Sequence, residues 1–160
     1  MISKFHGDCH WQRVALAGLA ICSRISDADP LVTVLFALFH DCRRIDEGHD
    51  PDHGFRSAEL AARLFDEGLL PITTKQAELL QQACADHSWA KRSDDPTLGA
   101  CWDADRIDLR RFDIALDPAL MSCGHLDIGS IIAEVDARSE TSPGWERLLM
   151  EAGWRDQACR

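Results

Sequence analysis

Histidine and aspartate stand at positions of this sequence where a helix would be expected to bury an apolar side chain. His10 continues the apolar stripe of a predicted helix over about residues 8–26, so its imidazole should face the core. A second predicted helix, over about residues 29–43, is almost wholly apolar until its stripe reaches Asp41, with His40 one residue before. Both segments therefore direct cation-binding groups towards the interior.

The same pattern recurs in two later segments. His87 lies on the apolar face of a predicted helix over about residues 73–88, and Asp105 lies on that of a helix over about residues 95–109. An ionised carboxylate on an apolar face costs several kcal/mol unless a positive charge compensates it. A divalent cation is the simplest compensation, and imidazole with carboxylate suits Mn, Fe, Ni, Co or Zn better than Ca.

Asp103 is the alternative to Asp105 for the last ligand. Helical spacing places Asp103 beside Arg106, whereas Asp105 shares the apolar face of Trp102. We therefore expect Asp105 to face the site. Arg106 is more simply interpreted as a brace that pairs with a carboxylate such as Asp103 or Asp41 than as a substrate contact.

The elements that must position these groups are helices throughout, because alternating strand patterns, repeats and Pro/Gly/Ser-rich linkers are hard to find. Helix starts are marked by Asp-Pro pairs at 29–30, 50–51 and 95–96 and by a capping-box pattern from Thr73 to Gln76. The other predicted helices lie over about residues 50–67, 127–138 and 143–152, with a turn at 117–118. We expect an all-α fold, a single compact bundle of about six to seven helices over residues 1–160.

The net charge and the apolar segments of the sequence limit the classes of binding partner. The net charge of -10 argues against an extended nucleic-acid surface or an anionic membrane surface. The longest apolar run, near VTVLFALF, is too short to span a bilayer, and the N-terminal residues lack a signal-peptide pattern, so we expect a cytoplasmic protein without a membrane. The seven scattered cysteines form no CxxC pair and are expected to be reduced thiols.

The order of these histidine and aspartate motifs along the chain resembles that of a known family. His10 in HWQRV, His40 and Asp41 in LFHDCRRID, and Asp105 in DADRID resemble the H…HD…D signature of HD-domain metal-dependent phosphohydrolases. The resemblance covers about residues 8–112 and implies a helical bundle of the HD-domain type that hydrolyses phosphate esters, often of nucleotides. Residues 113–160 have no such counterpart and are expected to pack as a cover.

Some members of that family add two histidines between the HD pair and the last aspartate, and hold two metal ions. His53 and His87 stand where such ligands would, which implies one or two ions bound by the full set His10, His40, Asp41, His53, His87 and Asp105. Asp41 would then be the catalytic carboxylate, bridging the ions and orienting the water. Ser88, directly after His87, departs from the doubled histidine of the cyclic-dinucleotide branch and argues against that substrate.

A phosphorylated substrate needs fixed positive charge near these ligands. Arg44 and Lys91 are the first candidates for substrate binding and Arg56 is a further one, since all three follow or adjoin expected ligands. Trp89 could flank the cleft and stack a base.

Three functions fit these residues. The first is a metal-dependent phosphohydrolase that acts through metal-activated water on a small phosphorylated substrate, most simply a nucleotide. The second is a di-iron oxygenase of the same domain type, and the third is a non-catalytic regulatory domain that a metal stabilises.

Overall fold

The chain folds as an all-α bundle, and a computed structural model describes residues 7–46, 48–141 and 143–155. Among these residues there are seven α-helices, two short 3-10 helices and no strand, which confirms the predicted fold class. Their bounds are α1 Asp8–Cys22, α2 Pro30–Phe39, α3 His53–Asp66, α4 Thr74–Asp86, α5 Pro96–Asp108, η1 Leu109–Phe112, η2 Pro118–Leu120, α6 Ile128–Ser139 and α7 Trp145–Glu151. Residues 1–6 and 156–160 of the predicted domain lie outside the described residues.

The predicted start signals of three helices are confirmed. The Asp29 carboxylate accepts hydrogen bonds from the first amides of α2, and Asp95 does the same for α5. Each helix has proline directly after its capping aspartate, where the missing N–H costs nothing. Thr73 and Gln76 form the expected reciprocal capping box at the start of α4.

Two boundaries differ from the prediction in ways that affect the site. The helix predicted from Asp50 begins at His53, because the Asp50 carboxylate accepts from Arg56 and from the amide of Ile45 instead of capping a helix. The helix predicted to run to about residue 43 ends at Phe39, so His40 and Asp41 lie in the turn that follows α2. Both differences place expected ligands at helix ends, where side chains from several directions can converge.

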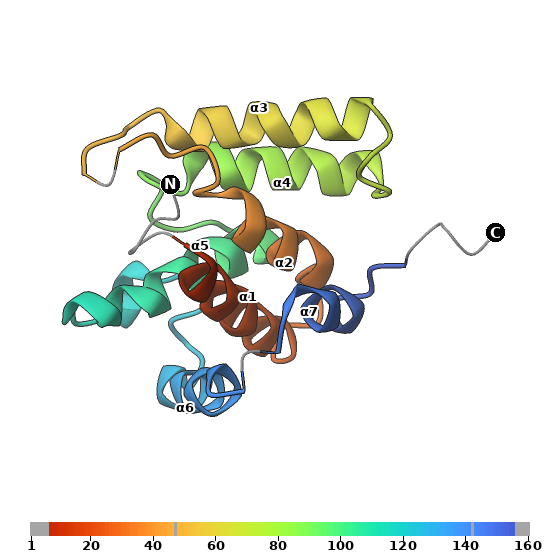
Figure 1. The fold of residues 1–160 in the computed structure, drawn as a ribbon. Coiled ribbons are helices and arrows are strands. Elements are labelled where there is room, and N and C mark those ends of the chain that lie inside the picture. The colour runs from red at the N-terminus through yellow and green to blue at the C-terminus, as the bar shows by residue number, and fades with distance from the viewer. Residues whose placement is uncertain (1–6, 47, 142, 156–160) are drawn as a thin grey trace.

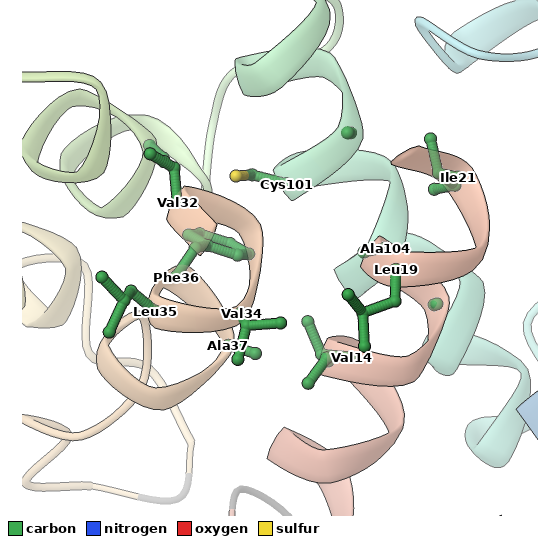
Figure 2. Close-up of a cluster of buried hydrophobic side chains, with 14 of the residues drawn as sticks. Val14, Leu19, Ile21, Val32, Val34, Leu35, Phe36, Ala37, Cys101 and Ala104 are labelled. Carbon is green, nitrogen blue, oxygen red and sulfur yellow. The ribbon is translucent and has the colours of Figure 1, made fainter. Parts of the chain in front are cut away.

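The central helix α2 packs against α1, α4 and α5. Phe36 of α2 is fully buried, and Figure 2 shows Val34 of the same helix pointing towards Val14 of α1. In Figure 1, α3 and α4 lie side by side over one end of the bundle. The buried apolar residues thus form one core. His40 and Asp41 are themselves buried and lie at the end of this core that faces α3 and α4.

Helices α6 and α7 lie away from the α3–α4 pair (Figure 1). Helix α6 packs on α1, and α7 contacts α2 and α1. Ile131, Val135 and Leu148 bury their side chains in these contacts. None of the helices described has the length and apolar character that crossing a bilayer would require. The six cysteines among the described residues are free, and Cys159 lies outside them.

Candidate metal centre

The six side chains expected to bind metal come together beyond the end of α2. They come from five separate segments: His10 from α1, His40 and Asp41 from the turn after α2, His53 from the start of α3, His87 from the end of α4, and Asp105 from α5. Two overlapping groups of donor atoms result, each able to hold a metal ion, and Asp41 belongs to both.

The first group surrounds the Nε2 atoms of His10 and His40, which lie 3.2 Å apart. Asp41 Oδ2 lies 3.8 Å from the first nitrogen and 3.5 Å from the second. Asp105 Oδ1 lies 3.4 Å and 3.7 Å from the same two atoms. Ligands bound at about 2.0–2.2 Å from a metal are separated by about 3.0–3.5 Å. The atoms of His10, His40 and Asp41 therefore need little movement to coordinate one ion, and Asp105 is close to both nitrogens.

The second group contains Asp41, His53 and His87. Asp41 Oδ1 lies 3.1 Å from His53 Nε2 and 3.7 Å from His87 Nε2, and the two nitrogens are 2.9 Å apart. Asp41 therefore presents Oδ2 to the first group and Oδ1 to the second. A carboxylate with this arrangement can bridge two cations.

Each of the four histidines has its Nδ1 atom against an oxygen that can only accept a hydrogen bond. The acceptors are Asp108 Oδ2 for His10 at 2.8 Å, the Phe36 and Ala37 carbonyls for His40 at 3.2 and 3.1 Å, the Asp50 carbonyl for His53, and the Cys84 carbonyl for His87 at 2.7 Å. Nδ1 must therefore carry the proton in every ring. The inward Nε2 atoms are left with lone pairs, which is the form that binds a metal.

Lone pairs that face each other at these distances repel unless positive charge lies between them. Burial lowers the pKa of His40 to about 4, although the charges of Asp41 and Asp105 oppose the shift, so a proton is a poor source of that charge. Burial also disfavours protonation of His87, but the hydrogen bond to Asp41 and the charge of Asp105 outweigh it and raise its pKa. The neutral nitrogens of the first group are thus in the form that could hold a metal ion.

Asp108 is a part of the site that sequence reasoning missed. Its Oδ2 holds His10 Nδ1, its Oδ1 accepts from Arg13 Nε at 2.6 Å, and Arg111 lies 2.9 Å from it. Burial would raise the pKa of this carboxyl, but the hydrogen bonds from His10 and Arg13 lower it. The spacing of these residues could have indicated Asp108. Asp108 lies one helical turn after Asp105, and Arg13 lies one turn after His10, so each pair shares a helix face.

Asp103 and Arg106 are placed away from the ligand groups. The Asp103 side chain is fully buried and accepts from the amide of Cys123 at 2.6 Å and from Arg106 at 3.0 Å. Arg106 also donates to the carbonyl of Ala90. This geometry favours Asp105 over Asp103 as a ligand and makes the Asp103–Arg106 pair a brace between α5 and neighbouring loops.

A cleft of about 690 Å³ opens above the two groups. This volume is in the range of small-molecule sites. Its walls include the predicted cations Arg44 and Lys91, the predicted stacking residue Trp89 and Phe112. Trp89 is 64% exposed. The third predicted cation, Arg56, does not line the cleft, because its guanidinium is held by Asp50 at 2.6 Å.

Comparison with protein-family models, with curated proteins and with solved structures finds no match to this chain. The resemblance of the HD pair and the DADRID segment to HD-domain proteins therefore stays a prediction. The paired ligand groups and the cleft above them carry the functional inference.

Proposed function

We propose that this protein is a metal-dependent phosphohydrolase of the HD-domain type that acts on a small phosphate ester, most simply a nucleotide. One observation carries the proposal. Asp41 offers one oxygen to each of two groups whose histidine Nε2 atoms all converge, at the floor of an open cleft.

The donor set indicates which ions fit. Neutral imidazole and carboxylate suit Mn, Fe, Ni, Co or Zn. The first group provides His10, His40 and Asp41, and Asp105 Oδ1 lies 3.4 Å from His10 Nε2 as a further candidate. The second group provides three protein ligands, which leaves positions for water or substrate. A divalent ion held there would lower the pKa of a bound water from about 15.7 towards about 7 and so supply hydroxide near neutral pH.

The protein's own residues would position the substrate. Lys91 is exposed on the cleft wall, where its ammonium can meet phosphoryl oxygens. Asp41, with its side chain 5% exposed, is fixed between the ligand groups and can accept a hydrogen bond from the attacking water. Trp89 offers an exposed ring at the mouth of the cleft on which a base could stack.

Metal analysis of the purified protein, followed by a phosphate-release screen, tests the proposal. The screen uses mono-, di- and cyclic nucleotides and small phosphate esters, each with Mn²⁺, Ni²⁺ or Co²⁺. We expect release from at least one substrate, and loss of turnover in His40→Ala and Asp41→Ala with the helical circular dichroism retained. His125→Ala is the matched control, because it removes an exposed imidazole outside the cleft.

Two outcomes would redirect the assignment. Bound iron with oxygen uptake and no phosphate release would favour a di-iron oxygenase. Bound metal without turnover on any substrate would favour a metal-stabilised regulatory domain.

A further inference from the structure

The guanidinium of Arg44 lies against the second ligand group. Its Nη1 atom is 3.1 Å from His53 Nε2 and 3.3 Å from Asp41 Oδ1. These are two of the three atoms that would bind the second metal ion. A protein cation thus shares its binding partners with a metal cation.

The two cations cannot use His53 Nε2 at once. His53 Nδ1 donates to the Asp50 carbonyl, so Nε2 has a single lone pair to offer. That lone pair either accepts a hydrogen bond from Arg44 or binds a metal at about 2.0–2.1 Å. The unit charge of Arg44 also repels a divalent ion at such short range.

The Arg44 side chain can move away from the ligand atoms. Its side chain is 16% exposed, it lines the cleft, and its Nη2 atom donates to the carbonyl of Gly48, an exposed residue in the loop before α3. A rotation about its side-chain torsions would move the guanidinium from the ligand atoms into the cleft. There it could meet a phosphoryl group, the role expected of Arg44 from the sequence.

We infer that Arg44 is an internal cation that competes with the second metal ion for Asp41 and His53. The centre would hold one ion at low metal concentration and two ions only when Arg44 moves aside. This inference rests on the proposed metal centre and adds a control on how many ions it holds. The Ser88 hydroxyl lies 3.2 Å from His53 Nε2 and would remain beside that nitrogen in either state.

Titration of the metal-free protein with Mn²⁺ tests the inference. Isothermal calorimetry gives the two affinities, and electron paramagnetic resonance reports the exchange coupling of a two-ion centre. In Arg44→Gln the second binding step should tighten about tenfold or more, since a unit positive charge has been removed from within a few ångströms. The first step should change by less, and the coupled signal should appear at lower Mn²⁺ concentration than in the wild type.

Two further variants sharpen the test. Arg43→Gln removes the same charge from a neighbouring exposed side chain and should leave both steps unchanged. Arg44→Lys keeps the charge, so its second step should stay weaker than that of Arg44→Gln, and it serves as the folded comparison if the glutamine variant is unstable. In the double variant Arg44→Gln, His53→Ala the tightened step should disappear.

The titrations distinguish failure of the proposed competition from failure of the proposed metal centre. An unchanged or weakened second step in Arg44→Gln would overturn the competition and leave the metal centre intact. Failure of the wild type and of every variant to bind Mn²⁺ would overturn the metal centre and the competition together.

Discussion

At the scale of single residues, Asp108 holds the ring of the candidate ligand His10 in place. It fixes the proton of His10 on Nδ1 and thereby aims the Nε2 lone pair at His40 and Asp41. The Asp108 carboxylate itself forms ion pairs with Arg13 of α1 and Arg111 of η1. A carboxylate behind a histidine ligand also raises the basicity of the ring, which strengthens metal binding.

Asp108→Asn should therefore weaken the first metal site while leaving every ligand in place. We expect the affinity of the first Mn²⁺ to fall about 10–100-fold, as for other residues that support a metal-bound histidine. Calorimetric titration measures the change. Asp136→Asn is the matched control, because Asp136 also pairs with Arg13, at 2.9 Å, but belongs to neither ligand group. Equal losses in the two variants would contradict a specific role for Asp108.

At the scale of elements, the site depends on where helices end and how closely they approach. Sequence patterns predicted the caps of α2, α4 and α5, because capping is a local interaction between neighbours in the chain. They missed the start of α3, because Asp50 is bound by Arg56, a contact that competes with the local cap. They also could not show that Gly54 lets α3 approach the backbone of α4.

Gly54→Ala should separate α3 from α4 and disturb the second ligand group. A Cβ atom at Gly54 would lie 2.5 Å from the Cys84 carbonyl oxygen, the backbone that also holds His87 Nδ1. We expect a loss of ~1–3 kcal/mol in the free energy of unfolding from this overpacking. Urea denaturation measures it, and Mn²⁺ titration should show the second step weakened more than the first.

Gly129→Ala on α6 provides the contrast for that variant. A Cβ there meets only a side-chain atom, Asp127 Oδ1 at 3.3 Å, which caps α6. Alanine at Gly129 should therefore cost less than at Gly54, where the contact is with backbone. Similar losses in both variants would indicate a general effect of glycine replacement, contrary to the proposed helix contact.

The loop before α3 is clamped by the Asp50–Arg56 ion pair. The Arg56 guanidinium and the Ile45 amide lower the pKa of Asp50 from 3.8 to about 2. Because the folded pKa lies below the unfolded one, this clamp stabilises the fold above about pH 4 and is lost as the pH falls towards about 2. Arg56→Gln should therefore lower the free energy of unfolding near neutral pH by ~1–2 kcal/mol.

The difference between wild type and Arg56→Gln should shrink as the pH drops below about 4, which urea unfolding at a series of pH values would show. Arg63→Gln, on the same helix, removes the exposed Arg63–Glu67 pair at 3.9 Å and should cost little at any pH. A pH-independent difference for Arg56→Gln would refute the clamp.

At the scale of the whole molecule, helical periodicity and cap signals were sufficient to predict an all-α bundle. His10 and His87 each replace one apolar residue in a regular stripe, which is why the sequence predicts buried positions for them. Asp105 is 22% exposed at the cleft, whereas the buried aspartate of α5 is Asp103. The side-chain contacts between different helices could not be predicted from the sequence, because they depend on packing between segments that are distant in the chain. Asp108 behind His10 and Arg44 against His53 are both contacts of this kind.

Metal binding should stabilise the entire fold, because the candidate ligands, Asp105 included, come from five segments of the bundle that are separate in the chain. An ion that binds only the folded protein, at a hundred times its dissociation constant, adds about 2.7 kcal/mol to the free energy of unfolding. For a chain of this length that corresponds to a rise in Tm of about 5–10 °C. Thermal unfolding followed by circular dichroism, with Mn²⁺ or with a chelator, measures the shift.

His40→Ala should reduce that rise to the part that the second group can supply, because it removes a fully buried candidate ligand of the first group, whereas His125→Ala should retain the full rise. The metal-free Tm of His40→Ala need not fall by the full cost of a lost core side chain. Removing one of two nitrogens that face each other at 3.2 Å also removes their repulsion. A Tm rise of unchanged size in His40→Ala would place the stabilising ion elsewhere on this acidic chain.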